Sequence, residues 1–474
     1  MESRVIPTTT TIASIGRVDV CLERALRRSG LLRCWACRTV AAGAAVAVLL
    51  VSGMWVAAPA SAGGVPGLGP GFLWGVAESG FQSEGHVRDS NWRRYIDAHP
   101  EMDRYGDSVD FFDRYGADID LAAALGAKVY RIGVEWSRLQ PNNSGEWDEA
   151  GFRFYDGVIA KIAASGMRPM ITLDHWVYPG WAYDRGGWAD PAMVGNWLAD
   201  MRKVVDRYAS RNPLWVTINE PVAYITMEAR YRGTDAAVML DRVAEAHNQI
   251  YDYIHQVRPD AWVTSNFGYV AGNDDQVNGP TLARIGAKLD YIGIDYYFGF
   301  EPWKAIALPA ILLSGSAGGS SQIWDLPLHT EGIYYALQRY SRLFPGKPLY
   351  IVENGMPTDN GLPRPDGYTR ADHLRDIVYW IQRATADGMN VIGYNYWSIT
   401  DNYEWGSYRP RFGLYTVDVP TDSALTRRAT DAVAAYSGII AGNGVPADYR
   451  PTRGPALCIL VDPPASCLTP ATVP

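Results

Sequence analysis

The stretch Leu349–Gly355 reads LYIVENG, in which an apolar run ends in a glutamate, an asparagine and a glycine. A continuous apolar run of this length is typical of a strand that is buried on both faces, as in a parallel sheet. A carboxylate at the end of such a strand is costly unless it has a partner. Glu353 is therefore a candidate functional residue if a second strand presents a carboxylate at the same level.

Strand-like and helix-like segments alternate along most of the chain. The candidate strands are 72–77, 129–136, 168–173, 215–219, 261–267, 291–297, 349–353 and 391–398. Amphipathic stretches such as 110–125 and 151–164 lie between most of them. This alternation indicates parallel βα units, and eight of them predict an α/β fold with a single closed (β/α)8 TIM barrel. No glycine-rich phosphate loop follows the first strand, which argues against a dinucleotide-binding fold.

The composition is that of a globular protein without a basic surface. Of the 474 residues, 47% are apolar and 20% are charged, and the net charge is −8. The charge predicts that no nucleic acid is bound. The 17 Trp and 29 Tyr residues are either a large core or, in part, a surface on which sugar rings stack.

The N-terminal 62 residues are predicted to be a targeting segment. Several arginines precede an apolar run at 40–58, and Ala60-Ser61-Ala62 follows as a small-residue cleavage pattern. We interpret residues 1–62 as a secretory leader that is cleaved after Ala62. The run is also long enough for an uncleaved membrane anchor. Either reading predicts a secreted or extracytoplasmic protein.

Residues 63–443 are predicted to form the barrel, and residues 444–474 a proline-rich C-terminal tail. Cys458 and Cys467 are the only cysteines outside the leader, and in an oxidising compartment they favour a small disulfide loop. The pair Cys34 and Cys37 lies in the leader, where chance spacing is a better explanation than a metal site. The seven histidines are scattered, so no metal site is predicted.

The end of the fourth strand carries the second carboxylate, in TINEP at 217–221. Active sites of (β/α)8 barrels lie at the C-terminal ends of the strands, so Glu220 and Glu353 are expected to meet there. Two carboxyl groups across a pocket are the minimum equipment for glycoside hydrolysis, one protonated and one ionised. Arg131 is the candidate cation that keeps Glu353 ionised. The alternative is that both glutamates merely end strands and are solvated.

Five motifs in order resemble glycoside hydrolase family 1, the β-glucosidase and β-galactosidase family, over residues 72–418. FLWGVAESGFQSEG resembles its first-strand signature and YRIGVEWSRLQP its second-strand segment. TINEP and YIVENG resemble its acid/base and nucleophile motifs. YWSITDNYEW, followed by RFGLYTVD, resembles its eighth-strand and sugar-recognition segment. The resemblance implies a retaining β-glycosidase, most often a β-glucosidase with β-galactosidase activity as a further option.

The resemblance also implies individual roles. Glu220 would be the general acid/base and Glu353 the nucleophile, with Arg131 and Tyr297 in contact with the nucleophile. Asn219 would bind the 2-hydroxyl of the sugar. The other residues expected around the same ring are Gln82, His175, Trp397, Glu404 and Trp405. No cofactor and no metal are implied, and the expected partner is a β-glycoside substrate.

Some positions depart from the family pattern. Asp295 in GIDYY stands where the family usually has asparagine, and Asp174–Pro179 differs from the usual sugar-facing wall. The connection from Asp295 to Tyr350 and the loop after Glu353 predict a more open or differently shaped aglycone site. Branches that act on 6-phosphorylated sugars replace Glu404 with a small residue, so its presence argues against them.

Two other functions stay open at this point. One is a non-catalytic sugar-binding protein on a degenerate barrel, although such proteins usually lose one of the two glutamates. The other is a transglycosidase, which uses the same residues with an acceptor other than water. The sequence does not show which of glucose, galactose, fucose and mannose is preferred, and it does not show the oligomeric state.

Overall fold

The computed structural model describes residues 64–299 and 323–455. The predicted leader, and Cys458 and Cys467 of the predicted disulfide, lie outside these residues. The chain separates into the units Met1–Ala58 and Pro59–Pro474, and only the second contains described residues. Within residues 64–299 and 323–455, no helix is both long enough and apolar enough to span a bilayer.

The predicted strands form one parallel sheet in the described ranges. They are β1 (Leu73–Ala77), β2 (Val129–Gly133), β3 (Arg168–Asp174), β4 (Leu214–Ile218), β5 (Trp262–Thr264), β6 (Asn266–Gly268), β7 (Ile292–Asp295), β8 (Leu349–Asn354) and β10 (Val391–Trp397). The order is β5-β4-β3-β2-β1-β10-β8-β7-β6. Ser265 alone separates β5 from β6, so the two ends of this order are consecutive parts of one strand. The sheet therefore closes on itself, and the (β/α)8 barrel is confirmed.

Two predicted strand boundaries are wrong for local reasons. The second strand ends at Gly133 rather than at residue 136, because Glu135 precedes the short helix α5 (Trp136–Leu139). The fifth strand is interrupted at Ser265, whose hydroxyl donates to the Ile218 carbonyl of the neighbouring strand.

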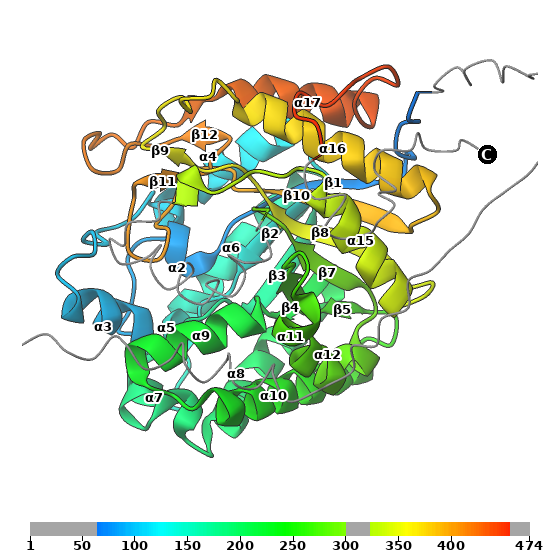
Figure 1. Cartoon of the computed structure of the whole chain (residues 1–474). Helices are drawn as coiled ribbons and strands as arrows, with labels where there is room; N and C mark the ends of the chain where they lie inside the picture. The colour runs from blue at the N-terminus through cyan, green and yellow to red at the C-terminus, as the bar shows by residue number, and fades with distance from the viewer. Residues whose placement is uncertain (1–63, 300–322, 456–474) are drawn as a thin grey trace, which may run out of the picture. The chain divides into compact units, whose positions relative to one another are not determined.

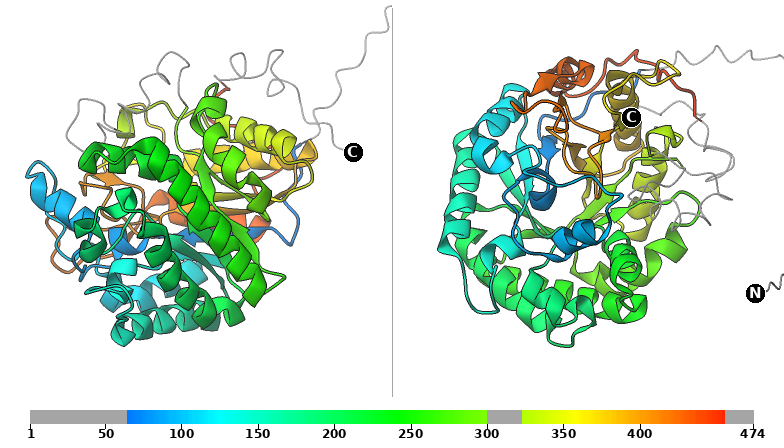
Figure 2. Two further views of the ribbon diagram at one scale, coloured as in Figure 1. Left: turned by 90° about the horizontal axis from the view of Figure 1, so that it is seen from below. Right: turned by 90° about the vertical axis from the view of Figure 1, so that its left-hand side faces the viewer.

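Helices surround the strands (Figure 1 and Figure 2). In the described ranges the connecting helices are α4 (Phe111–Ala124), α6 (Glu149–Ala164), α8 (Met193–Tyr208), α10 (Ala236–Val257), α12 (Gly279–Ile285), α15 (Gly332–Leu343), α16 (Arg370–Ala386) and α17 (Asp431–Gly442). Side chains start several of them. Asp148 caps α6, Asp235 caps α10, and Thr369 forms a capping box with Asp372 at α16.

Short elements lie in the loops between strands and connecting helices. They are α2 (Gly80–Ser83), α3 (Asn91–Ala98), α5, α7 (Gly180–Asp184), α9 (Pro221–Arg232), α11 (Asp274–Val277), η1 (Gly187–Ala189), η2 (Ala209–Arg211), η3 (Gly286–Lys288) and η4 (Ile323–Asp325). Two small antiparallel pairs join β9 (Thr358–Asp359) to β11 (Pro410–Arg411) and β12 (Tyr415–Thr416) to β13 (Arg428–Ala429).

The barrel has separate inner and outer cores. The inner cluster takes side chains from β2, β3, β4 and β8, among them Val129, Met170, Val216, Tyr350 and Val352. Alternate residues of the same strands pack outward in a larger cluster with the helices. An inner core built from several strands is typical of barrels that are filled rather than hollow.

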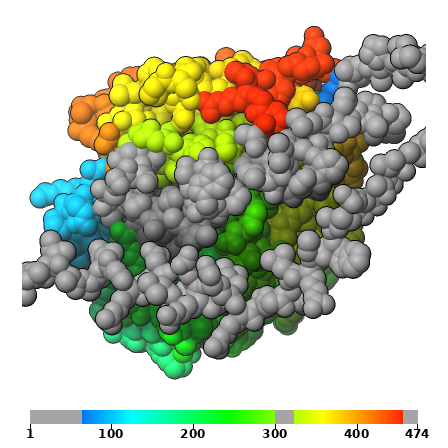
Figure 3. Space-filling model, in the orientation of Figure 1, coloured from blue at the N-terminus to red at the C-terminus, as the bar shows by residue number. Residues whose placement is uncertain are grey.

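The start of the predicted tail packs against the barrel. The Tyr449 hydroxyl donates to Asp376 of α16 at 2.7 Å, and the Thr452 amide donates to the same carboxylate at 2.8 Å. The Arg453 guanidinium lies 4.0 Å from the centre of the Tyr368 ring. In Figure 3 this segment, in red, lies against the yellow surface of α16.

Candidate active site

A bulge in β8 turns Glu353 into the barrel. Leu349 and Ile351 belong to the outer core, and Tyr350 and Val352 to the inner one, so strict alternation would place Glu353 outside. The pairing with β7 passes from Ile294–Ile351 directly to Asp295–Glu353 and skips Val352. Because β-bulges re-aim side chains, the carboxylate of Glu353 faces inward together with Val352.

The backbone conformation of Glu220, rather than a bulge, directs its side chain to the mouth of the barrel. It follows β4, adopts a left-handed conformation with φ 36°, and forms the N-cap of α9, with Pro221 next in the helix. A Cβ atom at Gly268 would lie 2.6 Å from Oε1 of Glu220. Position 268 therefore has to be glycine for the carboxyl group to keep its place.

Three carboxyl groups meet at the mouth of the barrel. Glu220, Glu353 and Asp295 each present a carboxylate oxygen, and these oxygens lie within 4.8 Å of one another. Such a set also has the spacing of a divalent-cation site. Here the Arg131 guanidinium forms an ion pair with Glu353 and supplies positive charge to the cluster. A second group with this spacing, His86, Asp110 and Asp113, is largely exposed.

Glu353 is held on both oxygens. Its Oε1 accepts from Arg131, and its Oε2 accepts from the Tyr297 hydroxyl at 2.7 Å. Arg131 is fully buried and also donates to Thr172 Oγ1 at 2.9 Å and to Asn219 Oδ1 at 2.6 Å. The cation is thus fixed in position before any ligand binds.

The other two carboxyl groups favour the protonated form. Burial, and then the negative charge of Glu353, raise the pKa of Glu220 to about 8, against a smaller lowering effect of Arg131. Burial, and then the charges of Glu353 and Glu220, raise the pKa of Asp295 well above its usual value. The two buried neighbours of the Arg131–Glu353 ion pair therefore both have raised pKa values, which favours their protonated forms.

A second set of polar side chains surrounds Glu404. Its Oε1 accepts from Trp397 Nε1 at 3.1 Å, and its Oε2 accepts from Gln82 Nε2 at 3.1 Å. Gln82 also donates to Asn402 at 3.2 Å. Burial raises the pKa of Glu404 to about 8, although the hydrogen bond from Trp397 opposes the rise.

Aromatic rings complete the wall. The His175 ring stacks between Trp397 and Trp405, with centroids 5.9 and 5.8 Å away. Asn219 Nδ2 lies 3.1 Å from His175 Nε2. Burial, with a smaller effect of Arg131, lowers the pKa of His175 well below its usual value, so the imidazole is neutral.

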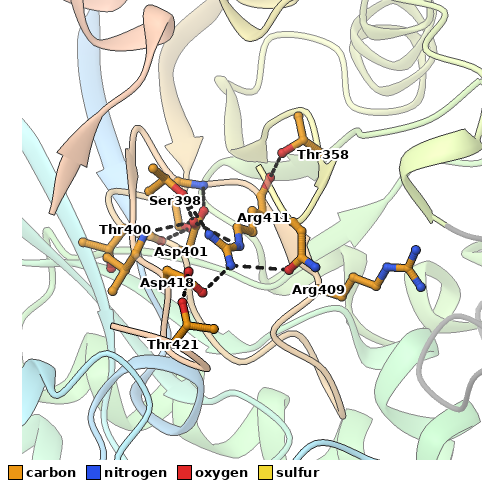
Figure 4. A network of polar contacts seen from close by, with 12 residues as sticks. Thr358, Ser398, Thr400, Asp401, Arg409, Arg411, Asp418 and Thr421 are labelled. Atoms are coloured by element: carbon orange, nitrogen blue, oxygen red, sulfur yellow. Dashed lines mark hydrogen bonds and ion pairs between the residues drawn. The ribbon is translucent and has the colours of Figure 1, made fainter. Parts of the chain in front are cut away.

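A charged network holds the segment that carries Glu404 and Trp405. Asp401 accepts from the amides of Gly413 and Val417 at 2.8 and 3.0 Å and from the Thr416 hydroxyl at 2.6 Å. Arg411 lies beside Asp401 and donates to Asp418 (Figure 4). The loop after β10 is thereby tied down on the side away from the cavity.

All the expected sugar-site residues in the described ranges lie in this one region, on several strands and on the segments that follow them. Three further residues belong with them. Asn266 Nδ2 donates to both Asn219 Oδ1 and Asp295 Oδ2, and Trp176 Nε1 donates to the Asn219 carbonyl at 2.8 Å. Asp295 stood out in the sequence only as a departure from the family pattern. Asn266 begins β6, the second part of the interrupted fifth strand, and carried no sequence signal of its own.

A barrel mouth with two close carboxyl groups, one with a raised pKa and one paired with an arginine, has the equipment of the glycoside hydrolases that act through a carboxyl pair. The profile of glycosyl hydrolase family 1 matches residues 67–269 and 314–445. The match covers more than half of the chain. The chain belongs to glycosyl hydrolase family 1 and is a β-glycosidase.

Individual relatives agree with this assignment. Beta-glucosidase A of Thermotoga maritima is 26% identical over 449 residues, which cover 79% of this chain and 98% of the relative. The thermostable beta-glucosidase B of Thermobispora bispora is 28% identical over 461 residues, or 82% and 94% of the two chains. The solved family 1 β-glucosidase from Thermotoga maritima has the same fold, with a TM-score of 0.69, 23% identity, and coverage of 80% and 99%.

Proposed function

We propose that the protein is an exported retaining β-glucosidase that also accepts β-galactosides, with Glu353 as nucleophile and Glu220 as acid/base. The separation of the two carboxyl groups carries the proposal. Retaining enzymes hold their carboxyl groups about 5–5.5 Å apart, and inverting enzymes about 6.5–9.5 Å apart to admit a water. The nearest oxygens of Glu220 and Glu353 lie within 4.8 Å of each other, which is closer than the spacing of inverting enzymes and supports the retaining class.

In the first step Glu353 attacks the anomeric carbon of the bound sugar. A bond forms between that carbon and a Glu353 oxygen while the glycosidic bond breaks. Glu220 passes its proton to the departing oxygen, so the aglycone leaves as a neutral alcohol. The ion pair with Arg131 keeps Glu353 ionised for the attack, and burial keeps Glu220 protonated for the donation.

In the second step water replaces the enzyme on the sugar. Glu220, now ionised, takes a proton from the water, and the oxygen of that water attacks the anomeric carbon. The bond to Glu353 breaks, and the sugar leaves with its original β configuration. Both carboxyl groups return to their starting protonation states.

The polar group at Glu404 supports recognition of a neutral hexose. Glu404 and Gln82 present acceptors and donors to ring hydroxyls, and Trp397 presents a flat face to the ring. Nδ1 of His175 is buried and has no hydrogen-bond partner among the described residues, so it is available to a sugar hydroxyl. Glucose is proposed as the preferred sugar because several relatives, Beta-glucosidase A of Thermotoga maritima and the thermostable beta-glucosidase B of Thermobispora bispora among them, are named as β-glucosidases.

A substrate panel tests this proposal. Aryl β-glycosides of glucose, galactose, fucose and mannose are incubated with the enzyme, and the configuration of the first-formed sugar is followed by proton NMR. We expect the β-glucoside to be cleaved fastest and the β-anomer to be released first. First release of the α-anomer would contradict the roles of both glutamates, and no cleavage of any glycoside would favour a sugar-binding protein. Added alcohol acceptors, followed by product analysis, distinguish hydrolysis from glycosyl transfer.

Export is a separate part of the proposal. It is supported by the arginine-rich start, the apolar run at 40–58 and Ala60-Ser61-Ala62, and by the family match, which begins just beyond this segment at residue 67. N-terminal sequencing of the protein from the culture medium and from the membrane fraction tests it. We expect a mature chain that begins at Gly63 in the medium. An intact N-terminus in the membrane fraction would indicate an anchor instead.

A further inference from the structure

A cavity of about 170 Å³ extends away from the catalytic pair, on the side of Glu220. It lies between α9, α11 and the segments that follow β6 and β7 (Figure 1). A single water needs about 10–15 Å³ in the same measure, so the cavity has room for an aryl ring or for several linked carbons. We call it the apolar cavity, and its outer wall contains Val222, Ala223, Met227, Val270, Val277 and Phe298.

The cavity is on the leaving-group side of the site. Glu220 and Asp295 line its inner end, and the Tyr297 ring lies beside them. The sugar-binding group around Glu404 is not part of its lining. Since Glu220 donates its proton to the departing oxygen, whatever is attached to that oxygen has to enter the apolar cavity.

Two polar side chains in the lining of the cavity, Thr226 and Asn278, already donate hydrogen bonds to the protein. Thr226 donates its hydroxyl proton to the Val222 carbonyl at 2.8 Å. Asn278 Nδ2 donates to the Gly268 carbonyl at 2.8 Å and to Asp274 Oδ1 at 2.6 Å. Nearer the catalytic pair, the Tyr297 hydroxyl is bonded to Glu353. In the described part of the chain, the outer wall therefore presents mainly hydrocarbon and ring faces.

A second sugar fits such a wall poorly. Most of its hydroxyls would leave water for hydrocarbon and ring faces, and buried polar groups without partners are unfavourable. An apolar leaving group gains from the same burial, by about 4-fold in binding for each methylene removed from water. The site around Glu404 has the opposite character, with a hydrogen-bonding group on each side of the carboxylate.

We propose that the apolar cavity selects β-glycosides whose leaving group is an apolar alcohol, aryl or alkyl, over those whose leaving group is another sugar. The proposal rests on the proposed function, because it takes Glu220 as the group that protonates the leaving oxygen. The expected substrates are therefore alkyl and aryl glycosides rather than cello-oligosaccharides.

The test measures kcat/KM on a series of alkyl β-glycosides, with methyl, butyl, hexyl and octyl groups, and on the disaccharide cellobiose. The sugar of the series is the one that the substrate panel identifies. Butyl, hexyl and octyl alcohols are nearly equal in acidity, so differences among them report binding rather than leaving-group chemistry. We expect kcat/KM to rise at least about 10-fold from butyl to octyl, and the octyl glycoside to exceed cellobiose.

A pair of variants on α9 locates the effect. Ala223 faces the apolar cavity, whereas Ala229 lies on the same helix outside its lining. Ala223→Asn places an amide in the cavity and is expected to lower the octyl-to-cellobiose ratio by about 10-fold. Ala229→Asn makes the same change elsewhere on the helix and is expected to keep the ratio.

Failure of this inference is distinguishable from failure of the proposed function. If the enzyme cleaves methyl β-glycosides but gains nothing with chain length, or prefers cellobiose to the octyl glycoside, the inference is wrong and the β-glycosidase assignment stands. If it cleaves none of the glycosides, both proposals fall. The chain-length series on the unmodified protein decides between these outcomes even if the Ala223 variant does not fold.

Discussion

Glu353 and Glu220 have the same side chain and lie close together at the barrel mouth, yet they are positioned and stabilised differently. Glu353 is reached through a β-bulge and has a partner on each oxygen, Arg131 and Tyr297. Glu220 stands on a left-handed residue at the start of a helix, and no hydrogen bond contributes to its raised pKa. Charge pairing dominates at one glutamate and desolvation at the other.

The difference teaches how one residue type can serve two roles at neutral pH. A fixed cation favours the ionised carboxylate, and burial without a partner favours the neutral acid. The two effects also reinforce each other, because the charge on Glu353 raises the pKa of Glu220. The following predictions test this division, in descending order of expected effect.

Removal of the nucleophile is expected to have the largest effect. Glu353→Gln keeps the shape of the side chain but removes the charge that attacks the sugar, so kcat should fall by at least about 10³-fold. Release of p-nitrophenol from an aryl β-glucoside measures the loss. The matched control is Glu101→Gln at an exposed position, which should keep full activity. A Glu353→Gln variant with unaltered turnover would be incompatible with the proposed mechanism.

Removal of the acid should depend on the leaving group. Glu220→Ala is expected to slow cleavage of alkyl β-glucosides by about 10²–10⁴-fold, because their poor leaving groups need a proton. Activated aryl glycosides need little help at the bond-breaking step, and added azide should restore their turnover by replacing water. An equal loss for alkyl and activated aryl substrates, with no effect of azide, would count against the acid/base role.

Displacement of the acid without removing it is expected to cost less. Gly268→Ala places a Cβ atom 2.6 Å from Glu220 Oε1, so the carboxyl group has to move. A misplacement of this kind costs about 10²-fold in kcat/KM for alkyl glucosides. Gly279→Ala is the control, because no atom lies within 4 Å of its Cβ position. Equal thermal unfolding of the two variants, with loss of activity in the first only, would separate positioning from folding.

The pH dependence of kcat/KM should show the ionisation of Glu220. Since the pKa of Glu220 is raised to about 8, its proton is present below that pH and is lost above it. We expect kcat/KM to fall on the alkaline side with a midpoint near pH 8, by about 10-fold for each further pH unit. In Glu220→Ala this alkaline limb should disappear for activated substrates. A limb that persists there would belong to another group.

The sequence predicted the barrel and the position of the two glutamates at the ends of its strands, because both depend on local patterns. Apolar runs followed by polar motifs mark strand ends, and strand ends of a parallel barrel meet at one mouth. The inward direction of Glu353 was not predictable in this way. Alternation from Leu349 and Ile351 would point it outward, and the bulge that reverses it depends on the pairing of β8 with its neighbours.

The apolar cavity was also beyond sequence reasoning. Val222, Val270, Val277 and Phe298 come from different loops and short helices, and each is an ordinary apolar residue in its own segment. The same holds for Asn266, whose bonds to Asn219 and Asp295 arise only from the packing of neighbouring strands. The departure at Asp295 predicted a change in polarity near the site. In the structure, Asp295 is a third carboxyl group beside Glu220 and Glu353.

The smallest effect is expected at Asp295 itself. Its Oδ2 accepts from Asn266, and burial beside Glu353 and Glu220 raises its pKa well above the usual value, which favours the neutral acid. Asp295→Asn replaces one neutral group with another of the same shape. We therefore expect kcat/KM at pH 6 to stay within about 3-fold of the unmodified enzyme, with the alkaline limb near pH 8 unmoved. Asp295→Ala, which removes the partner of Asn266, should cost more. If Asp295 were instead ionised, Asp295→Asn would remove a negative charge beside Glu220, lower the pKa of that acid, and move the alkaline limb to lower pH.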